Sequence, residues 1–189
     1  MITKGQEYLI ALGANLRSSA GVPQQTLREA LGFLDRSGAY IKKVSPFYRT
    51  PCFPPGAGPD YVNAAAVMVY DGPADLALDV LHKAEAEFGR ERVQRWGRRT
   101  LDLDLVAAGD TILPDTDTHA AWRHLSMDQQ VEQTPDQLIL PHPRLQDRAF
   151  VLVPLADVAP DWVHPVLGQS VREMLAQLPR EALKDVVAL

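Results

Sequence analysis

The chain has 189 residues, which is enough for one domain with a full hydrophobic core. Hydrophobic residues make up 46% and charged residues 23%, an ordinary composition for a globular protein. The formal net charge of -5 argues against broad nucleic-acid binding, which needs a basic surface. No apolar run approaches the roughly 20 residues of a membrane-spanning helix, and the N-terminus lacks the features of a signal peptide. We therefore expect a single domain, residues 1–189, in the cytoplasm, with no nucleic-acid or membrane partner.

The first part of the chain alternates predicted strands and helices. The short apolar run 8–12 predicts a buried strand, and apolar residues at helical spacing predict an amphipathic helix over 23–36. Residues 40–48 are predicted to be extended, and the segment 52–59, dense in Pro and Gly, to be an irregular loop. Residues 61–70 predict a strand that is buried on both faces in its second half.

The second part is patterned less evenly. A helix is predicted over 73–89, and alternating apolar and acidic residues predict a half-buried strand over 101–106. Residues 110–137 are polar and weakly patterned, which indicates a functional loop or partial disorder. The apolar run 150–155 predicts a further strand, and the spacing of apolar residues over 171–178 predicts a last short helix.

These elements follow the order β-α-β-β-α-β before the tail. With two helices packed on an antiparallel or mixed sheet, the simplest architecture is a ferredoxin-like α+β sandwich. The segment from 110 to 137 is added to it as an extended loop.

Five arginines fall within ten residues of this acidic chain: Arg90, Arg92, Arg95, Arg98 and Arg99. The guanidinium group presents a planar fork of donors that suits phosphate oxygens. A solvated charged loop, paired with neighbouring glutamates, is the alternative.

Two carboxylates follow these arginines directly. Asp102 and Asp104 lie two apart in a predicted strand, so both point to one face, while Leu101, Leu103 and Leu105 point to the other. Adjacent carboxylates repel each other unless a cation is shared between them. Magnesium typically takes one or two carboxylates together with water and phosphate oxygens. The pattern therefore indicates a triphosphate clamp, against the alternative of a structural network of arginines and carboxylates.

Other clusters offer rings and polar groups. Tyr61 and Asn63 share one face of a predicted strand, where a ring and an amide can stack on and hydrogen-bond a flat heterocycle. His142, Arg148 and Phe150 add a histidine, a cation and another ring. Each cluster alone is more often structural. The chain has no GxxxxGK[ST] motif, so a bound nucleotide would be held by arginines and metal and not by a P-loop.

At these clusters the sequence resembles the 6-hydroxymethyl-7,8-dihydropterin pyrophosphokinases of folate biosynthesis. Four blocks match that family in the same order: FYRTP at 47–51, DYVNA at 60–64, RWGRRTLDLD at 95–104 and PHPRLQDRAFVLVPL at 141–155. The resemblance implies a ferredoxin-like fold and transfer of the β,γ-pyrophosphate of ATP to the pterin hydroxymethyl group, with release of AMP. It also implies two Mg²⁺ ions bound by Asp102 and Asp104, and we expect a monomer.

The resemblance further implies a role for individual side chains. The catalytic residues would be Arg90, Arg99, Asp102 and Asp104. ATP would be bound by His82, Glu85, Arg92, Arg95, Trp96, His142 and Arg148. The pterin would be bound by Thr50, Pro51, Phe53, Tyr61, Asn63 and Phe150.

Three features depart from the family pattern. Ala14 stands where the family usually has serine, and Arg98 stands where a small residue or proline is common. The region 110–137 is longer than in compact members, and it precedes Pro141 and His142. It either folds over the adenine side of the site or extends outward.

Two rival functions use the same fold class. A non-catalytic nucleotide-binding module would lack one metal carboxylate or one pterin ring, but Asp102, Asp104, Tyr61 and Phe150 are all present. An RNA-binding domain would need an aromatic strand and a basic sheet, and the sequence has neither. The lone Cys52 can form neither an internal disulfide nor a CxxC metal site, and we expect no nucleophilic role for it.

Overall fold

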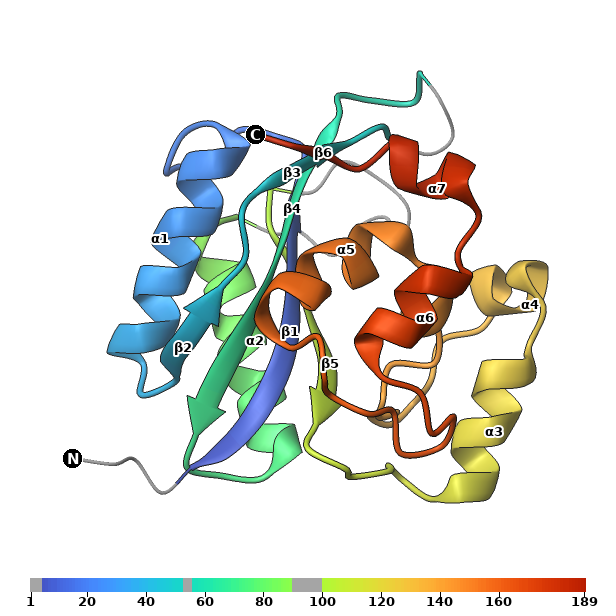
Figure 1. Ribbon diagram of the computed structural model, residues 1–189. Coiled ribbons are helices and arrows are strands. Elements are labelled where there is room, and N and C mark those ends of the chain that lie inside the picture. Colours follow the sequence, from blue (N-terminus) through green and yellow to red (C-terminus); the bar gives the residue numbers. More distant parts are fainter. Residues whose placement is uncertain (1–4, 53–55, 90–99) are drawn as a thin grey trace.

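A computed structural model describes residues 5–52, 56–89 and 100–189, which form an antiparallel sheet with helices on both faces (Figure 1). The described strands are β1 (Gln6–Ala14), β2 (Tyr40–Val44), β3 (Tyr48–Thr50), β4 (Tyr61–Tyr70), β5 (Asp102–Ala108) and β6 (Val187–Ala188). They lie in the order β5-β1-β4-β3-β6, and β2 also pairs with β4. The described helices are α1 (Pro23–Arg36), α2 (Ala74–Glu87), α3 (Thr116–His124), α4 (Met127–Glu132), α5 (Ala149–Val158), α6 (Val171–Gln177), α7 (Arg180–Lys184) and the 3-10 turn η1 (Leu145–Asp147).

The predicted order of elements is confirmed from β1 to β5, and so is the mixed α+β class. The segment predicted to be extended over 40–48 forms two strands, β2 and β3, which both pair with β4. Ser45 bridges the break between them. Its N–H donates to the carbonyl of Ala65 at 2.9 Å, and its Oγ accepts from the N–H of Ala65 at 2.9 Å. The side chain thus continues the pairing where the strand is interrupted.

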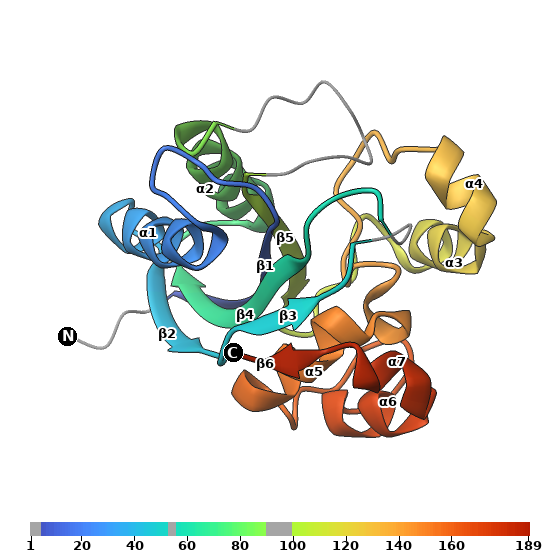
Figure 2. The ribbon, with the colours of Figure 1, turned by 90° about the horizontal axis from the view of Figure 1, so that it is seen from above.

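The sheet has a core on each face because its side chains alternate. Tyr8, Ile10 and Leu12 of β1 are buried against α1 and α2. Leu9 belongs to a second cluster on the opposite face, which includes Leu152 of α5. Figure 2 shows the sheet between these two groups of helices, with α1 and α2 on one side and α5 and α6 on the other. Each strand residue therefore faces one of two distinct surroundings.

The prediction of a strand over 150–155 is wrong, because this segment lies in helix α5. A continuous apolar run is compatible with a buried strand or a buried helix, and periodicity alone does not separate them. The buried residues Val151, Leu152, Leu155 and Val158 follow helical spacing. Pro154 is tolerated inside the helix although it cannot donate a backbone hydrogen bond.

The prediction of an extended loop over 110–137 is also wrong, because the segment contains helices α3 and α4. Asp115 caps α3 by accepting a hydrogen bond from the N–H of Thr118, and Ser126 caps α4 in the same way through Gln129. The base of the excursion is closed by a two-way backbone pairing of Leu113 with Leu140, at 2.9 and 3.1 Å. The long connection is therefore an ordered insertion between two paired residues.

The C-terminal segment returns to the sheet. The helix predicted near 171–178 is confirmed as α6, whereas α7 and β6 were not predicted. Strand β6 pairs with β3, and the N–H of Leu189 donates to the carbonyl of Phe47 at 2.9 Å. Among the described residues, no helix is long and apolar enough to cross a membrane.

The helical packing of α5 predicts unequal costs for two neighbouring substitutions. Leu152 is fully buried against the sheet, whereas Val153 is half-buried. Leu152→Ala should lower the free energy of unfolding by about 2–5 kcal/mol, and Val153→Ala by less than about 1 kcal/mol. Urea unfolding of both variants measures the difference. Losses of similar size would contradict this packing of α5.

Candidate functional site

One row of residues across the sheet brings the predicted metal side and the predicted acceptor side together. Gly13 of β1 lies opposite Asp102 of β5 on one side and opposite Asn63 of β4 on the other. Ala11 lies opposite Asp104. Residues directly opposite in an antiparallel pair share a face of the sheet. Both carboxylates and the amide therefore stand on one face, separated only by residues with little or no side chain.

The predicted alternation along β5 is confirmed. Asp102 and Asp104 are half-buried, whereas Leu101, Leu103 and Leu105 are buried in the core beneath α1 and α2. The leucines fix the strand, and the carboxylates face the opposite side. Two carboxylates at this spacing are a donor set that suits magnesium when phosphate oxygens and water complete the coordination. Within the described residues no group of three or more acidic, histidine or cysteine side chains is arranged to hold a metal ion.

The predicted acceptor side, formed by Thr50, Tyr61 and Asn63, is organised by a buried hydrogen bond. The amide nitrogen of Asn63 donates to the hydroxyl of Thr50 at 2.6 Å, and both side chains are about 7% exposed. Thr50 lies opposite Tyr61, whose ring is half-buried, and the exposed Pro51 follows β3. The structure therefore brings Thr50, Tyr61 and Asn63 together, as the sequence predicts.

Gly13 lies within the candidate site, although it is not among the site residues predicted from the sequence. A Cβ atom at this position would lie 3.0 Å from Oδ1 of Asn63 and 4.0 Å from Cδ1 of Tyr61. With the amide nitrogen of Asn63 bound to Thr50, its oxygen is turned toward Gly13. A glycine inside an apolar strand run is a signal of such a close approach.

The backbone of His142 is anchored at a β-bulge. Leu9 lies opposite Ala107 and Ile10 lies opposite Leu105, so Val106 has no partner residue on β1. The carbonyl of Val106 accepts a hydrogen bond from the N–H of His142 at 2.8 Å. Bulges are common beside active sites, where they redirect the chain. Here the bulge attaches the histidine segment to the strand that carries both carboxylates.

The ring of His142 is neutral near pH 7. Burial, with a further contribution from the positive charge of Arg148, lowers its pKa from 6.5 to about 3, although the negative charge of Asp102 acts in the opposite direction. Its Nδ1 accepts a hydrogen bond from the N–H of Arg144 at 3.1 Å. The guanidinium carbon of Arg148 lies 5.7 Å from the ring centroid of Phe150, which is 40% exposed in the first turn of α5. His142, Arg148 and Phe150 therefore border the same region as Asp102.

Glu85 has a structural partner that the sequence did not suggest. Its Oε1 accepts a hydrogen bond from the N–H of Leu103 at 2.8 Å, and the side chain is 2% exposed. Among the described strands β5 is an edge strand, so no neighbouring strand accepts a hydrogen bond from the N–H of Leu103. The carboxylate of Glu85 accepts it instead. His82, on the same helix, is half-buried. The nucleotide contacts expected of Glu85 and His82 remain predictions.

Several predicted site residues lie outside the described residues. They are Phe53, Arg90, Arg92, Arg95, Trp96 and Arg99. The arginine clamp of the triphosphate therefore remains a prediction from the sequence. What the structure places is the sheet row, the acceptor side and the segment 141–150.

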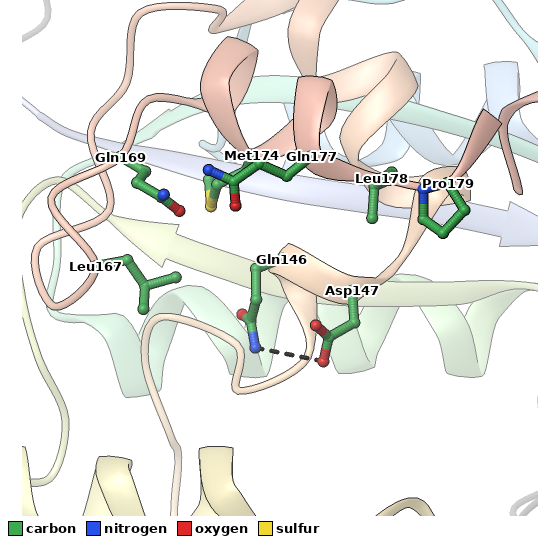
Figure 3. Close-up of a pocket in the computed structure, with 8 residues that line it drawn as sticks. All are labelled: Gln146, Asp147, Leu167, Gln169, Met174, Gln177, Leu178 and Pro179. Atoms are coloured by element: carbon green, nitrogen blue, oxygen red, sulfur yellow. Dashed lines mark hydrogen bonds between the residues drawn. The ribbon is translucent and has the colours of Figure 1, made fainter.

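A separate hollow of about 410 Å³ lies between η1 and α6, and Figure 3 shows Gln146 and Asp147 across it from Met174 and Gln177. The amide nitrogen of Gln146 lies 3.5 Å from Oδ2 of Asp147. None of the predicted site residues lines this hollow. The candidate site is therefore the polar end of the sheet face and not this hollow.

An antiparallel α+β sandwich with paired carboxylates beside an amide and a ring is an arrangement suited to a metal-dependent group-transfer enzyme. Residues 9–160 match the model of the 7,8-dihydro-6-hydroxymethylpterin-pyrophosphokinase (HPPK) family. The chain belongs to this family.

Relatives from several bacteria support the assignment. The chain is 36% identical to the 2-amino-4-hydroxy-6-hydroxymethyldihydropteridine pyrophosphokinase of Pseudomonas aeruginosa, covering 95% of this chain and 96% of that protein. It is also 36% identical to the pyrophosphokinase of the same name from Synechocystis, covering 94% of this chain and 79% of that protein.

A solved structure shows the same fold. The crystal structure of a Plasmodium falciparum HPPK-DHPS triple mutant superposes with a TM-score of 0.64 at 16% identity. The match covers 93% of this chain but only 44% of the Plasmodium chain. At this identity the likeness concerns the fold alone.

The lowered pKa of His142 predicts an acid-dependent loss of stability. Its folded-state pKa of about 3 lies below the ordinary value of 6.5, so the unfolded chain binds the proton more tightly. The contribution of the neutral His142 ring to the free energy of unfolding is complete above about pH 6.5 and is lost as the pH falls toward 3. Replacing it by His142→Gln should reduce the slope of unfolding free energy against pH by up to about 1.4 kcal/mol per pH unit. Urea titrations without magnesium from pH 6 to 4 measure this slope, and parallel curves would contradict the prediction.

Proposed function

We propose that this chain transfers the β,γ-pyrophosphate of ATP to the hydroxymethyl group of 6-hydroxymethyl-7,8-dihydropterin and releases AMP. The observation that carries the proposal is the row formed by Asp102, Gly13 and Asn63. In this row a carboxylate suited to a metal ion and an amide suited to a heterocycle lie on one face of one sheet. Family membership and the names of the bacterial relatives support the reaction and its substrates.

The spacing of the row suits a reaction between two bound substrates. Two strand separations of about 4.8 Å place the backbones at Asp102 and Asn63 about 10 Å apart. Gly13 lies between them and adds no side chain. A phosphate chain held at the carboxylates and a hydroxymethyl group directed from the amide side can therefore meet above Gly13. Phosphoryl transfer depends mainly on such positioning and on charge neutralisation.

The acceptor ring is held by groups from strands β3 and β4, from the segment after β3 and from helix α5. Thr50 fixes the amide of Asn63, so the carboxamide oxygen is left to accept from a donor on the edge of the pterin. The rings of Tyr61 and Phe150 stack on the two faces of the pterin ring. Pro51 and Phe53 complete this side of the pocket in the proposal.

The nucleotide is held from the opposite side. Asp102 and Asp104 would hold two magnesium ions, which supply charge neutralisation at the triphosphate when bound. Arg148 and the neutral ring of His142 contact phosphate oxygens, and His82 and Glu85 lie toward the nucleoside. The remaining cations and the ring of the proposed clamp are Arg90, Arg92, Arg95, Arg99 and Trp96.

The proposal includes a monomer that acts in the cytoplasm as a single domain over residues 1–189. The described part of the site supports the monomer, because all of its residues come from one sheet and the segments that flank it. A second copy is not needed to complete that part. Sedimentation as a dimer at micromolar concentration would contradict the monomer.

Product analysis tests the reaction and the metal side together. With magnesium, ATP and the hydroxymethyl pterin, the protein should release AMP in a pterin-dependent manner. Asp102→Ala should lower turnover by roughly 100-fold or more, because the carboxylate acts on the transition-state charge. The dissociation constant of the pterin should change by less than about threefold, because the ring is held at β4 and α5.

Asp110→Ala, in the exposed turn after β5, is the matched control and should behave as the parent protein does. Release of ADP, or no pterin-dependent product, would refute the reaction. Equal losses of turnover and pterin binding in Asp102→Ala would show that the carboxylate holds structure instead.

Thr50→Val tests the acceptor side. The substitution keeps the shape of the side chain but removes the hydroxyl that accepts from Asn63 at 2.6 Å. The KM for the pterin should rise by about tenfold, as expected for one lost buried hydrogen bond, while MgATP binding is unchanged. Thr111→Val is the control and should leave the KM for the pterin unchanged, because Thr111 follows the end of β5 that lies away from Asp102. A rise in the KM for MgATP alone would contradict this assignment.

A further inference from the structure

We propose that His119 of α3 is a positioning residue for His142, and that His164 fixes His119 from behind. The insertion that carries α3 would then support the nucleotide side of the site from outside the sheet. The inference rests on the proposed function, in which His142 contacts ATP.

His119 is hydrogen-bonded to the residue directly before His142. Its Nε2 lies 2.9 Å from the carbonyl oxygen of Pro141, and its side chain is fully buried. His142 is held on its other side by its N–H, which donates to the carbonyl of Val106 at 2.8 Å. The backbone at the nucleotide side is therefore held between α3 and β5.

The hydrogen-bond partners determine the tautomers of both histidines. The carbonyl of Pro141 can only accept, so Nε2 of His119 carries the hydrogen and Nδ1 keeps its lone pair. Nδ1 of His164 accepts from the N–H groups of Val166 and Leu167 at 3.1 and 3.3 Å, so its hydrogen is on Nε2. The two remaining nitrogens are buried, one a donor and one an acceptor, and neither has a hydrogen-bond partner among the described residues.

The two rings are packed against each other, and His164 also packs against Trp162, which is hydrogen-bonded to the residue after β5. The centroids of His119 and His164 are 5.9 Å apart in an edge-to-face arrangement, and the ring of Trp162 lies 5.8 Å from His164. The indole N–H of Trp162 donates to the carbonyl of Gly109 at 2.8 Å, just after β5. The support behind His119 thus returns to the strand that carries both carboxylates.

These contacts favour a positioning role over a metal site. A metal ion between the rings would need a lone pair on each remaining nitrogen, but that of His164 carries a hydrogen. Burial lowers the pKa of both histidines, and the positive charge of Arg123 lowers each further, so the pair is neutral near pH 7. A neutral, buried hydrogen bond to the backbone fixes position without adding charge.

Three substitutions on α3 test the inference. His119→Phe keeps a ring but removes the donor to Pro141, and the dissociation constant of a magnesium-bound, non-hydrolysable ATP analogue should rise by about tenfold. His119→Gln keeps an N–H donor at a similar reach and should restore binding to within about threefold. His124→Phe, at an exposed histidine of the same helix, is the matched control and should leave binding unchanged.

Calorimetry measures nucleotide binding, and steady-state kinetics should show a raised KM for MgATP with the KM for the pterin unchanged. His164→Leu removes the support behind His119 and should shift nucleotide binding in the same direction, so it provides the test if His119→Phe does not fold. The inference would be overturned if the folded His119→Phe variant bound the nucleotide as the parent protein does. It would also be overturned if binding of both substrates weakened equally and His119→Gln did not restore it. If the parent protein released no AMP, the proposed function would be refuted instead. Comparing nucleotide binding among the variants would still test the role of His119.

Discussion

The register of β1 between β4 and β5 is the constraint on which the candidate site depends. It places Gly13 opposite Asn63 on one side and opposite Asp102 on the other. A slip of one residue reverses the face of every side chain in a strand. If β5 slipped in this way, Leu103 would leave the core and Asp102 would enter it. The apolar side chains that stabilise the sheet therefore also determine which residues meet in the site.

The face of β5 that carries the carboxylates changes its surroundings along the strand. Near its start the strand presents carboxylates, whereas near its end the same face is covered by α5. At the bulge at Val106 the alternation is interrupted, and the consecutive residues Val106 and Ala107 both pack in the cluster under α5. The same bulge leaves the carbonyl of Val106 to bind the N–H of His142. The bulge thus puts two consecutive apolar residues under α5 and attaches the segment that contains His142 to β5.

The parts of the fold that could be predicted are those whose signal is local. The pairing of Asp102 with Asp104 follows from strand alternation, and the order of elements to β5 follows from periodicity. The helix α3 gave no such signal, because it is anchored through the polar His119 and not through an apolar stripe. Helix α5 was mistaken for a strand because it is apolar on nearly all sides. Gly13 was missed because its role depends on Asn63, which lies 50 positions later in the sequence. A Cβ atom on residue 13 would lie 3.0 Å from Oδ1 of Asn63.

The segments that border the candidate site are attached to the sheet by hydrogen bonds to backbone atoms as well as by apolar packing. Glu85 accepts from the N–H of Leu103, His142 donates to the carbonyl of Val106, and His119 lies at the carbonyl of Pro141. A hydrogen bond to the backbone constrains direction as well as distance, whereas apolar packing is non-directional. Because one partner in each bond is a peptide group, side-chain patterns carry no trace of it. Directional anchors suit a transfer reaction, in which small displacements of the reacting groups are costly.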